Sequence, residues 1–208
     1  MPVATFPIGP LATNSYIIYE NNKAAAIDVG GDPDDMLAFL HEHHLALDAI
    51  LITHLHFDHL YGVADLASAT GAAVYAPEKD QPLMATESGS GGIWGLPRVK
   101  QFAPIALHPG KSIFAGMECI VLETPGHTPG GVSYYFPNQH AVFPGDALFH
   151  RSIGRTDFPM GDHQQLLKSI KEGLLVLPDD TQVYPGHGSA TTIGAERKEN
   201  PFVGEFAS

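Results

Sequence analysis

Short apolar runs, interrupted by glycine and proline, recur along most of the chain. Runs of this kind that are rich in Val, Ile, Ala and aromatic residues predict β-strands. Several are apolar at nearly every position, which indicates strands covered on both faces. The predicted strands are residues 15–19, 24–29, 49–52, 73–76, 117–122, 132–136, 141–143 and 182–184.

Helix signals lie between these strands. Asp32 is placed to cap a helix that has Pro33 at its first position and two acidic residues, Asp34 and Asp35, in its first turn. Strands interleaved with helices imply helices packed on sheets. The other helices are predicted over about 61–70 with a left-handed cap at Gly71, from about Asp162, and after Thr192.

Composition and charge narrow the class of protein. With 44% hydrophobic and 16% charged residues the chain is not intrinsically disordered, and no apolar stretch approaches the ~18 residues of a membrane helix. Eleven basic against 23 acidic residues give a net charge of −12, which disfavours nucleic-acid and anionic-membrane partners. We expect a cytoplasmic protein with a single domain over residues 1–208, because no repeat, linker or signal peptide is visible.

Two smaller features complete this picture. The single cysteine, Cys119, leaves no internal disulfide and is expected to be a small buried strand residue. The glycine-rich stretch 87–94 lacks the spacing and context of a phosphate-binding loop, so we expect a surface loop there. A substrate lid tipped by Trp94 is the alternative interpretation.

The most informative segment is residues 54–59, with the pattern H-x-H-x-D-H directly after an apolar run. Residues two apart in extended backbone project to the same side, so His54 and His56 can chelate one ion. Asp58 and His59 lie where the loop turns into the next helix and can reach a second ion about 3.5–4 Å away. Burying these groups without partners would be costly, which favours a metal site.

Three further polar residues follow strands in proline- and glycine-rich turns: His127, Asp146 and His187. Loops at strand ends commonly present functional groups. An isolated histidine or aspartate in a loop is more often a hydrogen-bonding residue, and the H-x-H-x-D-H segment is what favours the metal interpretation. Five imidazoles and two carboxylates suit two cations such as zinc, iron or manganese.

This ordered set of motifs resembles the metallo-β-lactamase superfamily: H-x-H-x-D-H, a T-P-G-H-T-x-G turn, G-D and a late G-H, over about residues 15–187. The resemblance implies an α+β fold, a four-layer αββα sandwich with a dinuclear site at one edge of its sheets. It places the first metal on His54, His56 and His127, the second on Asp58, His59 and His187, and Asp146 between the two. Asp28 resembles the buried acid behind the ligands of the family, and the alternative for it is a turn aspartate.

Within the superfamily the chain is most similar to the short bacterial form of the hydroxyacylglutathione hydrolases, the glyoxalase II group. The resemblance rests on residues 145–149, 152–159 and 196–202. We expect no C-terminal helical glutathione-binding domain, which leaves the identity of the thiol open. Residues 154–158, Gly-Arg-Thr-Asp-Phe, also resemble the persulfide dioxygenases, in which one iron is held at positions matching His54, His127 and Asp146.

The hypothesis is hydrolysis of a small thioester, such as a 2-hydroxyacylglutathione, by a metal-bridging hydroxide, with two divalent ions of which zinc is favoured. Asp58 would be catalytic by orienting the hydroxide, and Arg155 would bind a substrate carboxylate. Alternatives are a mononuclear-iron persulfide dioxygenase, a hydrolase of another small ester, lactone or phosphoester, and a catalytically silent metal-binding module. The partner is a small molecule; metal identity, acyl group and oligomeric state are left open.

Overall fold

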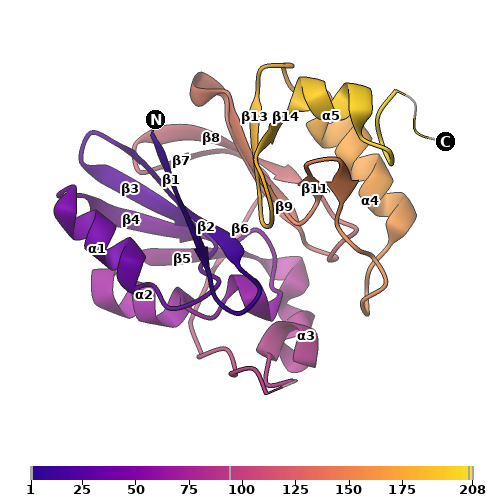
Figure 1. The fold of residues 1–208 in the computed structure, drawn as a ribbon. Coiled ribbons are helices and arrows are strands. Elements are labelled where there is room, and N and C mark those ends of the chain that lie inside the picture. The colour runs from indigo at the N-terminus through magenta and orange to yellow at the C-terminus, as the bar shows by residue number, and fades with distance from the viewer. Residues whose placement is uncertain (1, 94, 206, 208) are drawn as a thin grey trace. The chain divides into compact units, whose positions relative to one another are not determined.

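In the computed structural model, which describes residues 2–93, 95–205 and 207, the chain divides into two compact units (Figure 1). The first unit comprises the residues up to Leu107 together with Ile113–Met117. The second unit comprises His108–Ser112 and the residues from Glu118 onward. The single domain over residues 1–208 stays a prediction.

The first unit is built on a six-stranded sheet with the order β1-β2-β3-β4-β5-β6. The β1, β2 and β3 strands pair antiparallel, and the β3, β4, β5 and β6 strands pair parallel. Because β3 and β4 are parallel neighbours, the residues that follow them lie at the same edge of the sheet. The bounds are β1 (Val3–Ile8), β2 (Thr13–Glu20), β3 (Lys23–Ile27), β4 (Ala46–Leu51), β5 (Ala73–Pro77) and β6 (Ile105–Leu107).

Helices of the first unit cover the sheet. Figure 1 shows α1 (Asp34–Glu42) and α2 (Val63–Thr70) on the same face, and Met36, Leu40 and Leu66 join the strand residues in one apolar core. Gly71 closes α2 in the left-handed conformation at φ 73°, as predicted. Shorter helical turns follow at η1 (Phe57–His59) and η2 (Glu78–Ala85).

One helix prediction and one loop prediction need correction. The first helix begins at Asp34, so Pro33 is its cap rather than its first residue, although the Asp32 carboxylate does accept a hydrogen bond from the Asp34 amide at 3.1 Å. The stretch 87–94 was predicted to be a surface loop, but its residues Glu87–Ser90 form the short helix α3. This helical turn is closed by two hydrogen bonds, which the Thr86 carbonyl accepts from the amide and the hydroxyl of Ser90. Trp94 lies outside the described residues.

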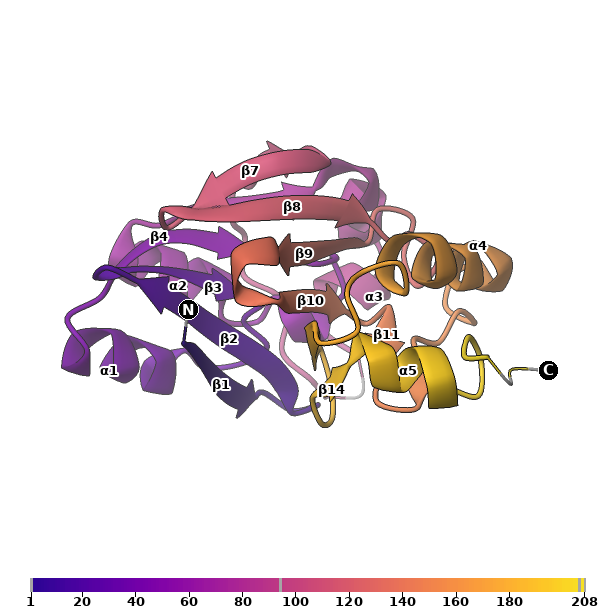
Figure 2. The same ribbon diagram turned by 90° about the horizontal axis from the view of Figure 1, so that it is seen from above.

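The second six-stranded sheet has the order β14-β13-β10-β9-β8-β7, and a two-stranded sheet, β11-β12, follows β10 in the chain (Figure 2). The β10 and β13 strands are parallel, whereas β9 pairs antiparallel with both β8 and β10. The bounds are β7 (Gly110–Phe114), β8 (Met117–Glu123), β9 (Val132–Phe136), β10 (Ala141–Gly145), β11 (Leu148–Phe149), β12 (Ser152–Ile153), β13 (Gln182–Pro185) and β14 (Thr191–Thr192).

Two capped helices belong to the second unit, α4 (His163–Ser169) and α5 (Ile193–Glu199). Asp162 accepts from the Gln165 amide at 3.0 Å and Thr192 from the Ala195 amide at 3.2 Å, so both predicted helix starts are confirmed. Leu166 and Ile193 of these helices pack with Val142 and Val183 of the sheet. Minor turns are η3 (Pro137–Gln139) and the π-helical η4 (Ile170–Leu174).

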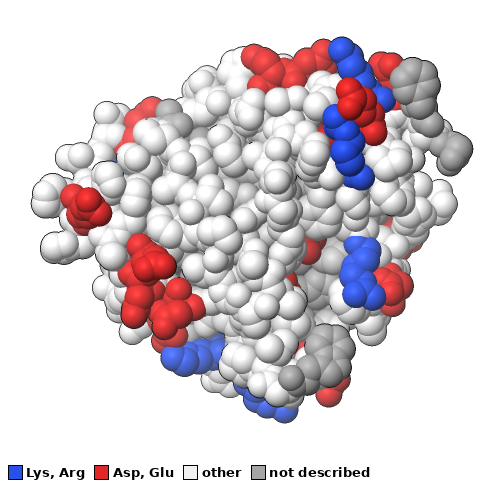
Figure 3. Space-filling view, in the orientation of Figure 1, with Lys and Arg blue, Asp and Glu red and all other residues white. Residues whose placement is uncertain are grey.

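All eight predicted strands are present, and β1, β6, β7, β11, β12 and β14 were not predicted. Cys119 is buried in β8, as expected, and burial raises the pKa of its thiol to about 12. No helix among the described residues is long and apolar enough to cross a membrane. On the face drawn in Figure 3, lysine and arginine side chains lie mostly beside acidic ones, in keeping with pairs such as Lys23–Asp48 and Lys100–Asp65.

Candidate metal centre

The four predicted ligands of the first unit lie together just beyond β4. His54, His56, Asp58 and His59 are each at most 7% exposed. The His54 ring centroid lies 4.9 Å from that of His56 and 4.2 Å from that of His59, and His59 Nε2 lies 3.6 Å from Asp58 Oδ2. Three imidazoles and a carboxylate buried this closely form a donor set that a cation would stabilise.

Asp28, in the first turn after β3, organises this group from behind. Its Oδ1 accepts from the Thr53 amide at 2.8 Å, and its Oδ2 accepts from Thr53 Oγ1 at 2.7 Å and from His59 Nδ1 at 2.8 Å. The carboxylate is 2% exposed, and Asp28 has a φ of 51°, a conformation that aspartate tolerates better than most residues. These contacts make Asp28 a buried acceptor for the ligand segment rather than a simple turn residue.

The same contacts fix which nitrogen of each ring is available to a metal. Because Thr53 donates its proton to Asp28, its oxygen accepts from His54 Nδ1, 3.0 Å away. His59 also carries its proton on Nδ1, because it donates to Asp28. Both rings therefore present the lone pair of Nε2, and such hydrogen bonds are what orient histidine ligands in metal sites.

Sequence reasoning missed three other contributors in this unit. Thr53 stands directly before the H-x-H-x-D-H pattern, and that position is a local signal that could have identified it. Thr13, the first residue of β2, donates a hydrogen bond to Asp58 Oδ2 over 3.4 Å. Tyr61 has a phenol pKa raised first by burial and then by the negative charge of Asp58. Thr13 gives no local signal, because it is 45 residues from Asp58.

The three predicted ligands of the second unit also lie together. Asp146 Oδ2 is 3.7 Å from His127 Nε2 and 3.6 Å from His187 Nε2. Asp146 directly follows β10, and His187 follows β13, whose Pro185 is the register partner of Gly145. The parallel pairing of these strands therefore delivers both side chains to one edge, where α/β sheets commonly bind ligands.

His127 is oriented by a backbone carbonyl. Its Nδ1 donates to the oxygen of Arg155 at 2.7 Å, which leaves Nε2 as the metal-binding nitrogen. The guanidinium of Arg155, which was predicted to bind substrate, is exposed and forms a fork with Asp157 at 2.7 and 2.6 Å. It also lies 4.1 Å from the centroid of the Phe158 ring. The Arg155 pairing holds the pKa of the Asp157 carboxyl at about 2.

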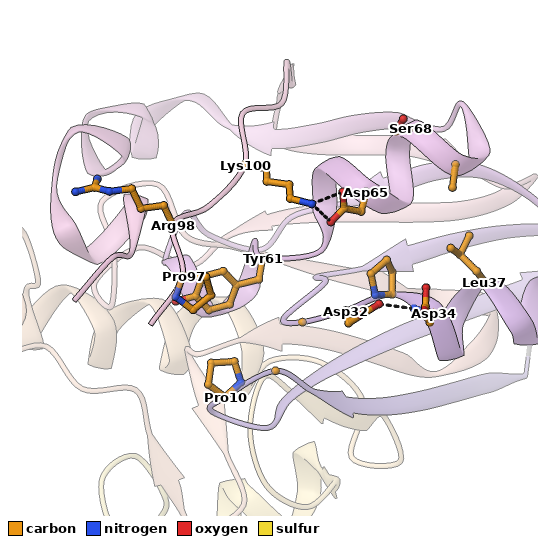
Figure 4. A pocket seen from close by; sticks show the side chains of 14 residues that line it. Pro10, Asp32, Asp34, Leu37, Tyr61, Asp65, Ser68, Pro97, Arg98 and Lys100 are labelled. Carbon is orange, nitrogen blue, oxygen red and sulfur yellow. Dashed lines mark hydrogen bonds and ion pairs between the residues drawn. The ribbon is translucent and has the colours of Figure 1, made fainter. Parts of the chain in front are cut away.

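A cavity of about 650 Å³ in the first unit is a separate feature (Figure 4). It lies between the β1–β2 turn, the start of α1, α2 and residues 97–100. Lys100 and Asp65 both line the cavity, and Lys100 Nζ donates a hydrogen bond to each carboxylate oxygen of Asp65 at 2.8 Å. No predicted metal ligand is among the described residues that line this cavity, so the candidate centre lies elsewhere.

All seven predicted ligands are members of His and Asp groups that could hold a metal ion. The structure thus brings four of them together in the first unit and three in the second. The set consists of imidazole nitrogens and carboxylate oxygens without a thiolate, which fits zinc, iron or manganese.

Comparisons with known proteins support this interpretation. A family profile described as the metallo-β-lactamase superfamily matches residues 8–187. The chain is 36% identical to hydroxyacylglutathione hydrolase GloC of Haemophilus influenzae, with 98% of each chain covered. Among solved structures it is similar to the BLEG-1 B3 metallo-β-lactamase, with a TM-score of 0.90, 37% identity and coverage of 97% of this chain and 99% of that one. TTHA1623 in a di-iron-bound form has a TM-score of 0.86, 39% identity and coverage of 97% and 100%.

Proposed function

Since this chain belongs to the metallo-β-lactamase superfamily of metal-dependent hydrolases and has its fold, we propose that it hydrolyses small thioesters, with 2-hydroxyacyl conjugates of glutathione as the representative substrates. The predicted fold class is confirmed by the similarity to the B3 enzyme. The similarity to GloC over nearly the whole of both chains supports the choice of a thioester among the substrates of the superfamily.

The observation that carries the proposal is that three of the predicted histidine ligands, His54, His59 and His127, hydrogen bond through Nδ1 to a protein oxygen and keep Nε2 for a metal. We propose that the ligands of both units form one binuclear site. One ion would be held by His54, His56 and His127. The other ion would be held by Asp58, His59 and His187. Asp146 would be a ligand of both ions.

When bound, the two cations would supply Lewis acidity, which lowers the pKa of a coordinated water to about 7 and polarises a substrate carbonyl. The residues of the chain hold and orient the reactants. Asp58, which accepts from Thr13, would align the attacking water. The leaving thiolate needs no obligatory proton donor, because thiols have a pKa of about 8.5. No protein nucleophile is required.

The experiment that tests this function combines metal analysis with two assays. The protein is purified without added metal, and its zinc, iron and manganese contents are measured. We expect two metal ions per chain and cleavage of S-lactoylglutathione under anaerobic conditions. One iron per chain, with oxygen consumption on glutathione persulfide and no thioester cleavage, would instead support the dioxygenase. The metal has to be measured because the donor set accepts several divalent ions and TTHA1623 binds two irons.

The proposed role of Arg155 makes a separate prediction. Arg155→Ala is expected to lower kcat/KM for an anionic thioester about 10–100-fold, mainly through KM, because a charge-assisted fork to a carboxylate is lost. The metal content of Arg155→Ala should equal that of the wild type, because the backbone carbonyl of residue 155, which accepts the hydrogen bond from His127, remains. Asp157→Asn is the matched variant: it releases the guanidinium from its fork and is expected to lower KM. An unchanged kcat/KM in Arg155→Ala would remove Arg155 from the substrate site.

A further inference from the structure

A fully buried carboxylate, that of Glu196 on α5, lies outside the proposed metal site. Its Oε1 accepts from Arg151 Nη1 at 2.9 Å and from Thr191 Oγ1 at 2.7 Å. Its Oε2 accepts from the Arg151 amide at 2.9 Å and from Asn200 Nδ2 at 2.8 Å. Two donors on each oxygen offset the cost of removing this charge from water. The carboxylate therefore forms a complete network around which the neighbouring chain is arranged.

This network holds the tight turn between β11 and β12. Glu196 binds the backbone amide of Arg151, and Asn200 Nδ2 also donates to the carbonyl of Ser152 at 3.1 Å. Arg151 has a φ of 57°, a left-handed conformation that costs an arginine energy and persists where surrounding contacts enforce it. Glu196 of α5 and its C-cap Asn200 thus hydrogen bond to backbone groups of two successive residues, Arg151 in the turn and Ser152 at the start of β12.

The chain that leaves this turn reaches two predicted ligands within a few residues. The Gly154 amide donates to the Ala147 carbonyl at 3.3 Å, and a Cβ built on Gly154 would lie only 1.8 Å from the backbone oxygen of Asp146. The next residue, Arg155, provides the carbonyl that orients His127. The segment 151–155 is therefore fixed at its start by α5 and contacts His127 and Asp146 at its end.

We infer that Glu196 is a positioning residue for His127: it fixes the turn at Arg151 and thereby places the Arg155 carbonyl that orients the imidazole. The consequence for metal binding rests on the proposed function, whereas the orientation of the ring does not. This inference assigns a task to the 196–202 motif, which the reaction itself does not use.

The neighbouring residue, Arg197, provides a matched control. Its Nε donates to the Leu175 carbonyl at 2.9 Å and its Nη2 to the Leu177 carbonyl at 2.8 Å, and it also pairs with Asp179. Arg197 therefore fastens the same helix to the segment after η4 and makes none of the contacts to the β11–β12 turn. Loss of either side chain weakens the anchoring of α5, but only loss of Glu196 releases the turn.

The test compares Glu196→Gln with Arg197→Gln in the full chain. Glutamine has one acceptor oxygen, so two of the four donors lose their partner. Nitrogen-15 spectra of the imidazole groups in metal-free protein should show His127 protonated on Nδ1 in the wild type and in Arg197→Gln, but a mixture of tautomers in Glu196→Gln. Zinc affinity, measured by competition with a chelator, should fall about 10–100-fold in Glu196→Gln alone.

Outcomes that contradict the inference are equally definite. It is overturned if Glu196→Gln keeps the wild-type His127 spectrum, or if Arg197→Gln changes that spectrum as much. Should Glu196→Gln fail to fold, Asn200→Ala, which frees the Ser152 carbonyl, is expected to shift His127 in the same direction to a smaller degree. If the wild-type protein binds none of zinc, iron and manganese, the proposed function fails, and the tautomer spectra still decide the role of Glu196.

Discussion

Gly154→Ala is expected to lower the metal content of the proposed binuclear site and to lower the free energy of unfolding by at least about 1–3 kcal/mol. An alanine Cβ would lie 1.8 Å from the backbone oxygen of Asp146 and 3.2 Å from His127 Nδ1. The distance to the Asp146 oxygen is far below van der Waals contact. Because that oxygen belongs to the backbone, the clash can be relieved only if the backbone at Gly154 or Asp146 moves. That movement displaces a predicted ligand and the group that orients another.

Urea unfolding and metal content after dialysis measure the two effects of this substitution. Gly173→Ala, in η4, is the control, because a Cβ at this position would meet only the backbone oxygen of Glu123, at 3.9 Å, outside its own helix. Alanine there should be neutral or stabilising by up to about 1 kcal/mol. Wild-type metal content and stability in Gly154→Ala would show that the close approach of this segment to Asp146 and His127 is not needed for the site.

Asp28→Ala is expected to cost more than about 3 kcal/mol of stability, because three buried donors lose one acceptor and each orphaned donor costs about 1–3 kcal/mol. The donors are the Thr53 amide, the Thr53 hydroxyl and His59 Nδ1. His59 Nδ1 would lose the Asp28 carboxylate as its acceptor, and Thr53 would no longer be held against His54 by Asp28. Metal affinity should therefore fall about 10–100-fold as well.

Denaturant unfolding of metal-free protein and chelator competition separate these two losses. Asp28→Asn keeps the shape and tolerates the positive φ, so it should lose less stability than Asp28→Ala while still weakening metal binding. Asp65→Ala removes an acid of a surface pair with Lys100 and should change stability by less than about 1 kcal/mol. Equal stability of Asp28→Ala and Asp65→Ala would contradict the role assigned to Asp28.

Elements with strong local signals were predicted correctly. The apolar runs at β2, β3, β4 and β9 match the strands, because a strand covered on both faces needs apolar side chains at successive positions. The helix cap at Gly71 and the helix starts at Asp162 and after Thr192 match because each depends on contacts within a few residues. The strands that were missed are short or lie at a sheet edge, and β1 contains Pro7, so their pattern is weak.

Whether a feature of the site could be predicted from the sequence depends on how far apart in the chain the contacting residues are. The kinds of side chain at the site are a matter of sequence, because the H-x-H-x-D-H spacing and the polar residues at strand ends are local patterns. The orientation of the rings was decided only by the tertiary structure. His59 finds its acceptor 31 residues away, His127 finds one 28 residues away, and Glu196 holds a turn 45 residues away. No periodicity records such pairs, because hydrogen bonds between distant segments form only after the sheets have brought those segments together.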